Sequence, residues 1–302
     1  MACFHPWTAY RQTNGQVLFT DKKGGDPLTV PCGQCLGCRL ERSRQWAMRC
    51  VHEASMHEHN VFITLTYDNE HIPPDGGLKK SDFQKFMKRL RKYAAPTKIR
   101  YYHCGEYGDN TNRPHYHAIL FGWNFDDWVY LFDSNSGCPI YTSPTLEKIW
   151  GKGFVTIGHV TFESAGYVAR YCMKKLNGPL KNQVNKKTGL KPYERIVNYA
   201  SKPIEVMPEY STMSRRPGIG RDWIARYTRD VYPKDFTTIR GMRMRPPTYY
   251  DAYLKQMEPD LYDFIKNCRD LAAYTSDENT GERLSAREKV KKAQFKQLKR
   301  SL

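Results

Sequence analysis

The chain has no long apolar stretch. A membrane-spanning helix takes about 20 consecutive apolar residues, and no run in these 302 residues approaches that length. The first residues also lack the apolar segment of a secretion signal. We therefore expect a protein that remains in the cytoplasm and has no membrane partner.

Two further patterns are missing, an internal repeat and the Gly-x4-Gly-Lys-Ser/Thr phosphate loop, so helicase activity is not encoded here. Acidic residues are also scarce: 31 Asp and Glu stand against 48 Lys and Arg, which gives a formal net charge of +17. Such a charge attracts polyanions and predicts a nucleic-acid partner. The alternative is a basic protein whose charges simply face water.

The strand predicted at 115–121 opens with two histidines. Side chains alternate along a strand, so His115 and His117 point to the same side. Glu106 lies on a strand predicted at 98–107, and the turn residues 109–112 make the two strands antiparallel neighbours. One carboxylate and two imidazoles can hold a divalent metal with positions left for a substrate. The spacing alone does not distinguish this metal site from two structural histidines.

A helix is predicted over 164–175, with Ser164 as its cap. Tyr167 and Tyr171 are four residues apart and share one helix face. A cation follows each tyrosine three residues later, and a phenol beside a cation and a bound phosphate can act as a nucleophile. Core packing is the alternative, because the chain contains 21 tyrosines.

Several segments together resemble the HUH endonuclease superfamily, and within it the rolling-circle initiators with two tyrosines. The similarity is greatest to the replication-associated proteins of microviruses, in the gokushovirus group, and it covers roughly residues 1–250. Tyr116 departs from the pattern, because the superfamily usually has an aliphatic residue between the histidines. The segments that carry the resemblance are 30–39, 62–67, 105–108, 113–117, 167–171 and 213–220.

The resemblance implies an enzyme of bacteriophage DNA replication that nicks single-stranded DNA at the viral origin. Manganese or magnesium on Glu106, His115 and His117 would polarise the scissile phosphate. Tyr167 or Tyr171 would attack phosphorus, leaving a 5′-phosphotyrosyl link and a free 3′-OH, and the link would later be religated. Helicase and polymerase would come from the bacterial host, in whose cytoplasm the protein would act. The residues that would assist the phosphate or the phenol are Lys174 and Lys175.

The nine cysteines are an odd number, and without a secretion signal we expect no disulfides. Cys32, Cys35 and Cys38 have the spacing Cys-x2-Cys-x2-Cys, and a hairpin within 17–30 could bring back Cys3 as a fourth thiolate. Four cysteines would form a closed, structural zinc site. An iron–sulfur run would need a following Cys-Pro, which is missing. The alternatives are three reduced loop cysteines, or a fourth ligand from Cys50 or His52.

The pattern of elements predicts an α+β fold, with an antiparallel central sheet and flanking helices, as in the HUH endonucleases. We divide the chain into a cysteine segment with a helix (1–58), the endonuclease core (59–250) and a basic helical region (251–302). Helices are expected at 39–58, 81–95 and 249–274, strands at 61–67, 98–107, 115–121 and 153–161, and irregular structure at 123–146, with a loop at 177–192.

Arg215 and Arg216 lie between a predicted strand and a helix from about residue 221, where they could grip phosphates. The alternative is an ordinary turn. For the whole chain two other functions stay open, a zinc-stabilised nucleic-acid-binding protein without catalysis and a relaxase or transposase with the same site.

Overall fold

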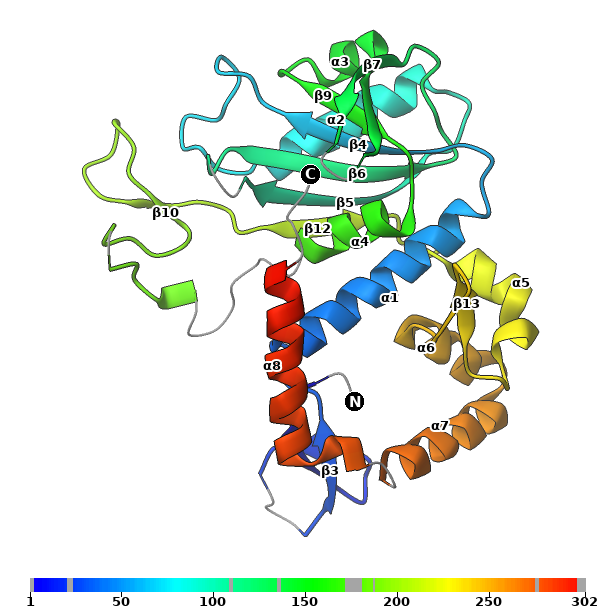
Figure 1. Cartoon of the computed structure of the whole chain (residues 1–302). Coiled ribbons are helices and arrows are strands. Elements are labelled where there is room, and N and C mark those ends of the chain that lie inside the picture. The colour runs from blue at the N-terminus through cyan, green and yellow to red at the C-terminus, as the bar shows by residue number, and fades with distance from the viewer. Residues whose placement is uncertain are drawn as a thin grey trace. The chain divides into compact units, whose positions relative to one another are not determined.

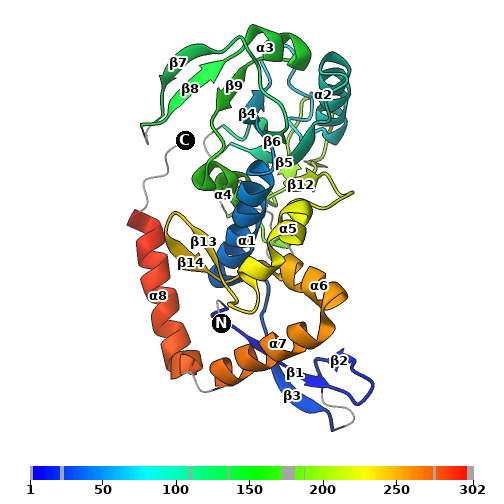
Figure 2. The same cartoon turned by 90° about the vertical axis from the view of Figure 1, so that its right-hand side faces the viewer.

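The structure is a computed structural model of the chain (Figures 1 and 2). It describes residues 3–20, 24–108, 111–134, 137–171, 181–186, 188–274 and 277–297. By its contacts the chain forms two units, Met1–Gln45 with Arg229–Arg300, and Trp46–Thr228. In the described part of the chain, no helix is both long and apolar enough to cross a membrane.

The unit Trp46–Thr228 is built on a seven-stranded sheet whose neighbouring strands are all antiparallel, in the order β12-β5-β6-β4-β9-β8-β7. This confirms the predicted α+β class and the antiparallel central sheet (Figure 1). The strands are β4 (Asn60–Thr66), β5 (Arg100–Tyr107), β6 (Pro114–Phe121), β7 (Val129–Asp133), β8 (Pro139–Thr142), β9 (Val155–Gly158) and β12 (Tyr210–Met213).

One face of this sheet is covered by α2 (Lys80–Tyr93) and α3 (Pro144–Trp150). The odd-numbered residues of β4 and the even-numbered residues of β6 point into this layer, as the two-residue period of a strand requires. The layer is rich in large aromatic side chains. Its fully buried members include Tyr67, Phe83, Phe86, Tyr116 and Trp150.

The other face is covered by α4 (Phe162–Tyr171) and by the part of α1 (Leu36–Ala54) that follows Gln45. Its core is smaller and contains small side chains from both helices, such as Ala47, Ala165 and Ala169. The side chains of the two predicted histidines also point to this face, so the candidate site lies on the less densely filled side of the sheet.

Several helix boundaries differ from the predictions. α1 starts at Leu36 rather than residue 39, because the amide of Arg39 already bonds to the carbonyl of Cys35 at 3.0 Å. α2 starts at Lys80, so Ser81 lies inside the helix and does not cap it. The residue at the cap position, Lys79, makes no side-chain capping bond.

The region 123–146, predicted to be irregular, contains the β7–β8 hairpin and the start of α3. Every residue of β7 is exposed, although the strand carries the apolar sequence Val-Tyr-Leu-Phe. Because no side of this edge strand is buried, its sequence lacks the alternation of a half-buried strand. Pairs of two strands also occur at β10 (Glu194–Arg195) with β11 (Ile204–Glu205).

The first unit contains a three-stranded sheet in the order β2-β1-β3 and a separate β13–β14 hairpin. Helices α6, α7 and α8 confirm the predicted helical character of 249–274 and of the basic region that follows. The elements of this unit are β1 (Trp7–Arg11), β2 (Val17–Leu18), β3 (Asp26–Val30), β13 (Thr237–Ile239), β14 (Met242–Met244), α6 (Thr248–Met257), α7 (Pro259–Tyr274), η2 (Asp277–Asn279) and α8 (Gly281–Gln297), with α5 (Arg221–Val231) running into it from the second unit.

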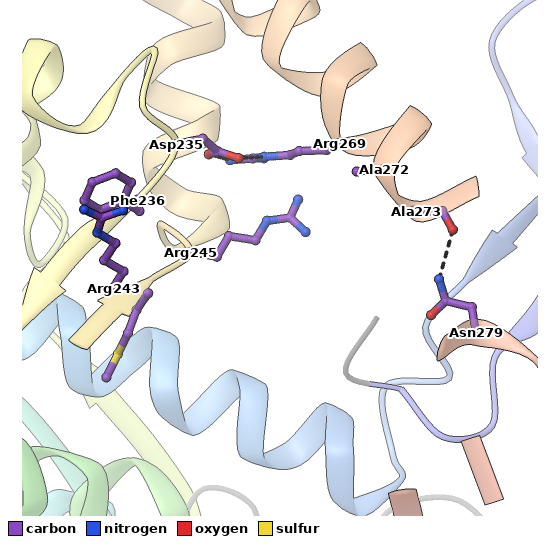
Figure 3. Close-up of a pocket in the computed structure, with 9 residues that line it drawn as sticks. Asp235, Phe236, Arg243, Arg245, Arg269, Ala272, Ala273 and Asn279 are labelled. Atoms are coloured by element: carbon purple, nitrogen blue, oxygen red, sulfur yellow. Dashed lines mark hydrogen bonds and ion pairs between the residues drawn. The ribbon is translucent and has the colours of Figure 1, made fainter. Parts of the chain in front are cut away.

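Arg269 of α7 binds two aspartates of the same unit. Its guanidinium lies 2.7 Å from Asp235 and 2.8 Å from Asp251, and the Tyr232 hydroxyl donates to Asp251 at 2.7 Å. Figure 3 shows the pair of Asp235 and Arg269 beside a cleft of 380 Å³. Because two carboxylates neutralise this arginine, we assign the cluster to the packing of α6 and α7 rather than to ligand binding.

Candidate active site

Both predicted histidines lie on β6 and face the layer of α1 and α4. The sheet register places Thr66 of β4 and Glu106 of β5 directly opposite His115. The same register places Thr64 opposite His117. Five polar side chains from three adjacent strands therefore gather on one face of the sheet, near the end of β6 at which the chain enters.

Glu106 and His117 are in direct contact. The Nε2 atom of His117 donates to the Glu106 carboxylate at 2.7 Å, and the two residues are only 3% and 6% exposed, in that order. A buried carboxylate is costly without such a partner. The contact is diagonal across the strands, because the residue directly opposite Glu106 is His115.

Two threonines hold the other nitrogen of each imidazole. Thr64 Oγ1 lies 3.0 Å from Nδ1 of His117, and Thr66 Oγ1 lies 3.1 Å from Nδ1 of His115. Since Nε2 of His117 must donate to a carboxylate, its neutral ring accepts the Thr64 hydroxyl at Nδ1. Partners of this kind fix the tautomer and orientation of a metal-ligating histidine. The sequence analysis gave neither threonine a role, although their alternation on β4 was visible.

Gly108 gives His115 the space it occupies. A Cβ atom added at this glycine would lie 3.0 Å from the Nε2 atom of His115. That separation is tighter than most contacts made by a real Cβ atom. A side chain at position 108 would therefore push against the nitrogen through which His115 could bind a metal.

Tyr116, the residue between the histidines, points to the opposite face and is fully buried there. Its hydroxyl accepts from the amide of Lys79 at 2.8 Å and lies 2.7 Å from the hydroxyl of Tyr67. Burial raises the pKa of Tyr116 to about 12, so it remains a neutral phenol. The departure from an aliphatic residue is thus accommodated by a hydrogen-bonded site.

Tyr167 of α4 approaches the histidines from the helical layer that covers this face. Its ring centroid lies 5.2 Å from that of His117, in an edge-to-face arrangement, and 6.3 Å from that of Phe62. α4 starts at Phe162, two residues before the predicted cap. Thr161 is the capping residue instead, because its hydroxyl accepts from the amide of Ser164 at 3.1 Å while Ser164 Oγ accepts from the amide of Thr161 at 2.8 Å.

The other predicted helix residues lie outside this description. α4 ends at Tyr171, whose side chain is not among the described residues. Lys174 and Lys175 also lie outside the described residues, so their roles stay predictions.

The three predicted metal ligands do not close around one point. In the part of the chain that is described, only the cysteine group discussed below brings three or more donor atoms within 4.8 Å of one another. The structure joins Glu106 to His117, and the ring centroid of His115 lies 6.4 Å from that of His117. One carboxylate and two imidazoles with fixed Nδ1 partners nevertheless form a donor set that suits a divalent cation.

Arg215 and Arg216 lie on the loop between β12 and α5, where Arg216 is exposed and Arg215 is half-buried to exposed along its side chain. The loop is anchored by α1: Glu53 accepts from the amide of Gly220 at 2.7 Å, and Arg49 donates to the carbonyl of Ile219 at 2.9 Å. Burial raises the pKa of Glu53, but its hydrogen bonds from His57, Gly220 and Arg100 outweigh this and lower it. The anchored loop therefore presents two cations on the α1 side of the sheet.

The first unit brings together the sulfur atoms of Cys3, Cys32, Cys35 and Cys38, all within 4.8 Å of one another. The rival ligands are elsewhere. Cys50 is buried in the core under α1, about 18 Å along the helix from Cys38. His52 stacks on Trp223 with 3.5 Å between ring centroids, and burial lowers its pKa to about 3.

These features define an α+β protein with paired histidines, a buried carboxylate and a helical tyrosine on one face of an antiparallel sheet. Residues 60–176 match a family of replication-associated proteins that is named for ORF2. The chain is 33% identical over 300 residues to the replication-associated protein ORF2 of Spiroplasma virus 4, a match that covers 90% of this chain and 87% of the relative. It therefore belongs to the replication-associated proteins of phages.

Two further relatives are similar over most of this chain. The replication-associated protein VP4 of Bdellovibrio phage phiMH2K is 31% identical, with 87% of this chain and 80% of the relative covered. The replication-associated protein ORF4 of Chlamydia phage 1 is 29% identical, with 78% and 56% covered. No solved structure matches the chain.

Proposed function

We propose that this protein initiates rolling-circle replication of viral DNA, by nicking and religating a single-stranded origin through a tyrosine, on an HUH endonuclease fold. The observation that carries the proposal is the position of His117, which contacts both the Glu106 carboxylate and the Tyr167 ring. A metal-ligating group and a nucleophile would thus stand on either side of one phosphate.

Glu106, His115 and His117 would hold a divalent cation, manganese or magnesium. When bound, the cation would neutralise charge on the scissile phosphate and polarise its P–O bond. The Nε2 proton of His117 has to leave before that nitrogen can be a ligand, so metal binding releases a proton. Thr64 then keeps the ring in place through Nδ1, at 3.0 Å.

The covalent step exchanges one phosphoester for another. The Tyr167 oxygen forms a bond to phosphorus and loses its proton, and the bond from phosphorus to the 3′ oxygen breaks as that oxygen takes up a proton. The products are a 5′-phosphotyrosyl link and a 3′-OH. An unperturbed phenol has a pKa of about 10, so a nearby cation favours its ionisation, which is the role we propose for Lys174 and Lys175.

A second tyrosine allows the cycle to close. Four residues separate Tyr167 from Tyr171, so on a helix both side chains lie on one face. After one round of synthesis, the second phenol can cleave the regenerated origin while the first phosphotyrosyl link receives the new 3′-OH. We propose that the two tyrosines alternate in this way, with Tyr171 acting first.

Binding of DNA before cleavage would rest on basic residues, in keeping with the net charge of +17. Arg215 and Arg216 are our candidates for phosphate contacts, since they lie on a loop that α1 fixes. Phosphate contacts position a strand without reading its sequence.

The test is formation of a covalent adduct between the full chain and a labelled single strand carrying the origin of its phage, with manganese present. We expect an adduct that survives denaturing electrophoresis. The double variant Tyr167→Phe, Tyr171→Phe should lose it and keep nearly all binding, because phenylalanine retains the ring. Tyr93→Phe is the matched control, since Tyr93 is 59% exposed on α2, which covers the opposite face of the sheet.

The outcomes separate the alternatives. Binding without any adduct in the wild-type protein would favour a nucleic-acid-binding protein without catalysis. An adduct that forms on transfer-origin or transposon-end DNA but not on phage origins would favour a relaxase or transposase. An adduct that persists in the double variant would remove both tyrosines from the mechanism.

A further inference from the structure

We propose that Cys3, Cys32, Cys35 and Cys38, the four-cysteine cluster, bind one zinc ion in a closed structural site that fastens the start of the chain to the first turn of α1. The sulfur of Cys3 lies 3.6 Å from that of Cys32 and 3.8 Å from that of Cys35. In a tetrahedral site with Zn–S bonds of about 2.3 Å, neighbouring sulfurs are about 3.8 Å apart. The cluster already has this spacing.

Other chemistries of clustered cysteines fit less well. A disulfide needs sulfurs about 2.05 Å apart, and all four cysteines of the cluster are free. An iron–sulfur cluster places several iron and sulfide atoms between its thiolates, which spreads them more widely than the 4.8 Å limit found here. A single tetrahedral ion is the occupant that matches the distances.

The backbone around the cluster favours thiolates. The amide of Cys35 donates to the sulfur of Cys32 at 3.3 Å, and the amide of Cys32 donates to the sulfur of Cys3 at 3.3 Å. The amides of Phe4 and Cys38 both donate to the sulfur of Cys35, at 3.3 and 3.5 Å. Cys38 also lies in the first turn of α1, where the helix dipole stabilises negative charge.

The three-stranded sheet needs such a fastening because it buries little. Of the described residues between 3 and 30, only Cys3, Phe4, Ala9 and Gln12 are buried. Two aromatic side chains of this region, Trp7 and Phe19, are 51% and 60% exposed. Segments with so small a core usually depend on disulfides or a structural metal. A zinc ion would join Cys3 to Cys32 across the whole sheet.

The first experiment measures metal in the full chain purified without a histidine tag. We expect one zinc per chain by elemental analysis, released when the thiols react with a mercurial. Protein prepared with cobalt in place of zinc should show the intense visible absorption of a tetrahedral four-thiolate site. Protein that contains no metal, or iron instead of zinc, would overturn the proposal.

Substitutions identify the ligands. Cys35→Ser should reduce zinc to background and abolish the cobalt spectrum, whereas Cys32→His should retain zinc, because imidazole is also a zinc ligand. Cys268→Ser is the matched control, since Cys268 is an exposed free cysteine of the same unit. Full zinc in Cys35→Ser, or equal loss in the control, would contradict the assignment.

A third measurement does not depend on how the variants fold. In the wild-type protein, the four cluster thiols should resist alkylation until a chelator is added, and peptide mapping should locate the newly labelled cysteines at 3, 32, 35 and 38. Rapid labelling of all four before chelation would show that no ion holds them.

Discussion

The two faces of the central sheet differ in what they bury. The face under α2 and α3 is packed with aromatic rings, and its buried polar atoms, such as the hydroxyls of Tyr67 and Tyr116, are hydrogen-bonded to one another. The face under α1 and α4 has a smaller apolar core and carries the buried pair of Glu106 and His117. Neighbouring residues of a single strand serve both faces, because side chains alternate.

The difference indicates a division of labour. A densely packed face fixes the backbone of β4, β5 and β6, and the fixed backbone then holds polar groups on the other face at defined distances. Polar groups that converge in this way are costly for folding, so a rigid layer behind them is needed. If this is correct, substitutions on the two faces should have effects of different kinds.

The largest contrast is expected between adjacent residues of β6. His117→Ala should abolish the covalent DNA adduct, because it removes a metal ligand and the partner of Glu106, and added manganese should restore part of it. Tyr116→Phe should keep the adduct and cost about 1–3 kcal/mol of unfolding free energy, because the amide of Lys79 loses its acceptor. Adduct yield and urea unfolding, measured on both variants, check this. Loss of the adduct in Tyr116→Phe would remove the distinction between the faces.

Trp150→Ala should give the largest loss of stability. The side chain is fully buried against Tyr67, Phe86 and Tyr116, and its indole donates to the carbonyl of Thr66 at 3.0 Å. Truncations of this kind cost about 3–5 kcal/mol, to be measured by urea unfolding.

The matched control for Trp150 is Phe154→Ala. Phe154 is another large aromatic residue but is 66% exposed, so the change should stay within about 0.5 kcal/mol. Adduct yield per folded molecule should be unchanged in both variants. An equal loss of stability in the two would show that the aromatic layer is not what stabilises the sheet.

The sequence predicts the strands that carry the site but not the contacts within it. Periodicity and turn residues were sufficient for β4, β5 and β6, and for placing His115 and His117 on one side. Thr64 and Thr66 were missed because their role depends on the register between β4 and β6, which is set by tertiary pairing. The contact between Glu106 and His117 was anticipated as joint metal binding, and its diagonal geometry was not.

Errors in the fold have physical causes of the same kind. The β7 strand was missed because an exposed edge strand shows no burial period. The start of α4 was misplaced because both Thr161 and Ser164 are capable caps, and the reciprocal bonds between them decide which one acts. By contrast, the thiolate cluster was foreseen, since cysteine spacing leaves few other arrangements.

A smaller effect is expected from the threonine behind His117. Thr64→Val keeps the shape of the side chain and removes the hydroxyl that holds Nδ1 at 3.0 Å. Loss of such a partner typically weakens metal binding about 10–100-fold. The manganese concentration that gives half-maximal adduct should rise accordingly. Thr156→Val is the control, because Thr156 flanks Thr64 on β9, away from His117. Equal shifts in both would indicate a general disturbance of the sheet.

The smallest effect should come from the arginines of the loop between β12 and α5, and it concerns DNA binding alone. If Arg215 and Arg216 each neutralise one phosphate, changing both to Gln should reduce the slope of log K against log salt by about 1.4, since each contact with single-stranded DNA contributes about 0.7. The control variant Lys88→Gln, Lys92→Gln removes the same charge from α2, on the opposite face of the sheet. Its slope should match that of the wild type. If both variants lower the slope equally, the DNA is held by the overall charge of the protein, and the loop between β12 and α5 has no special role.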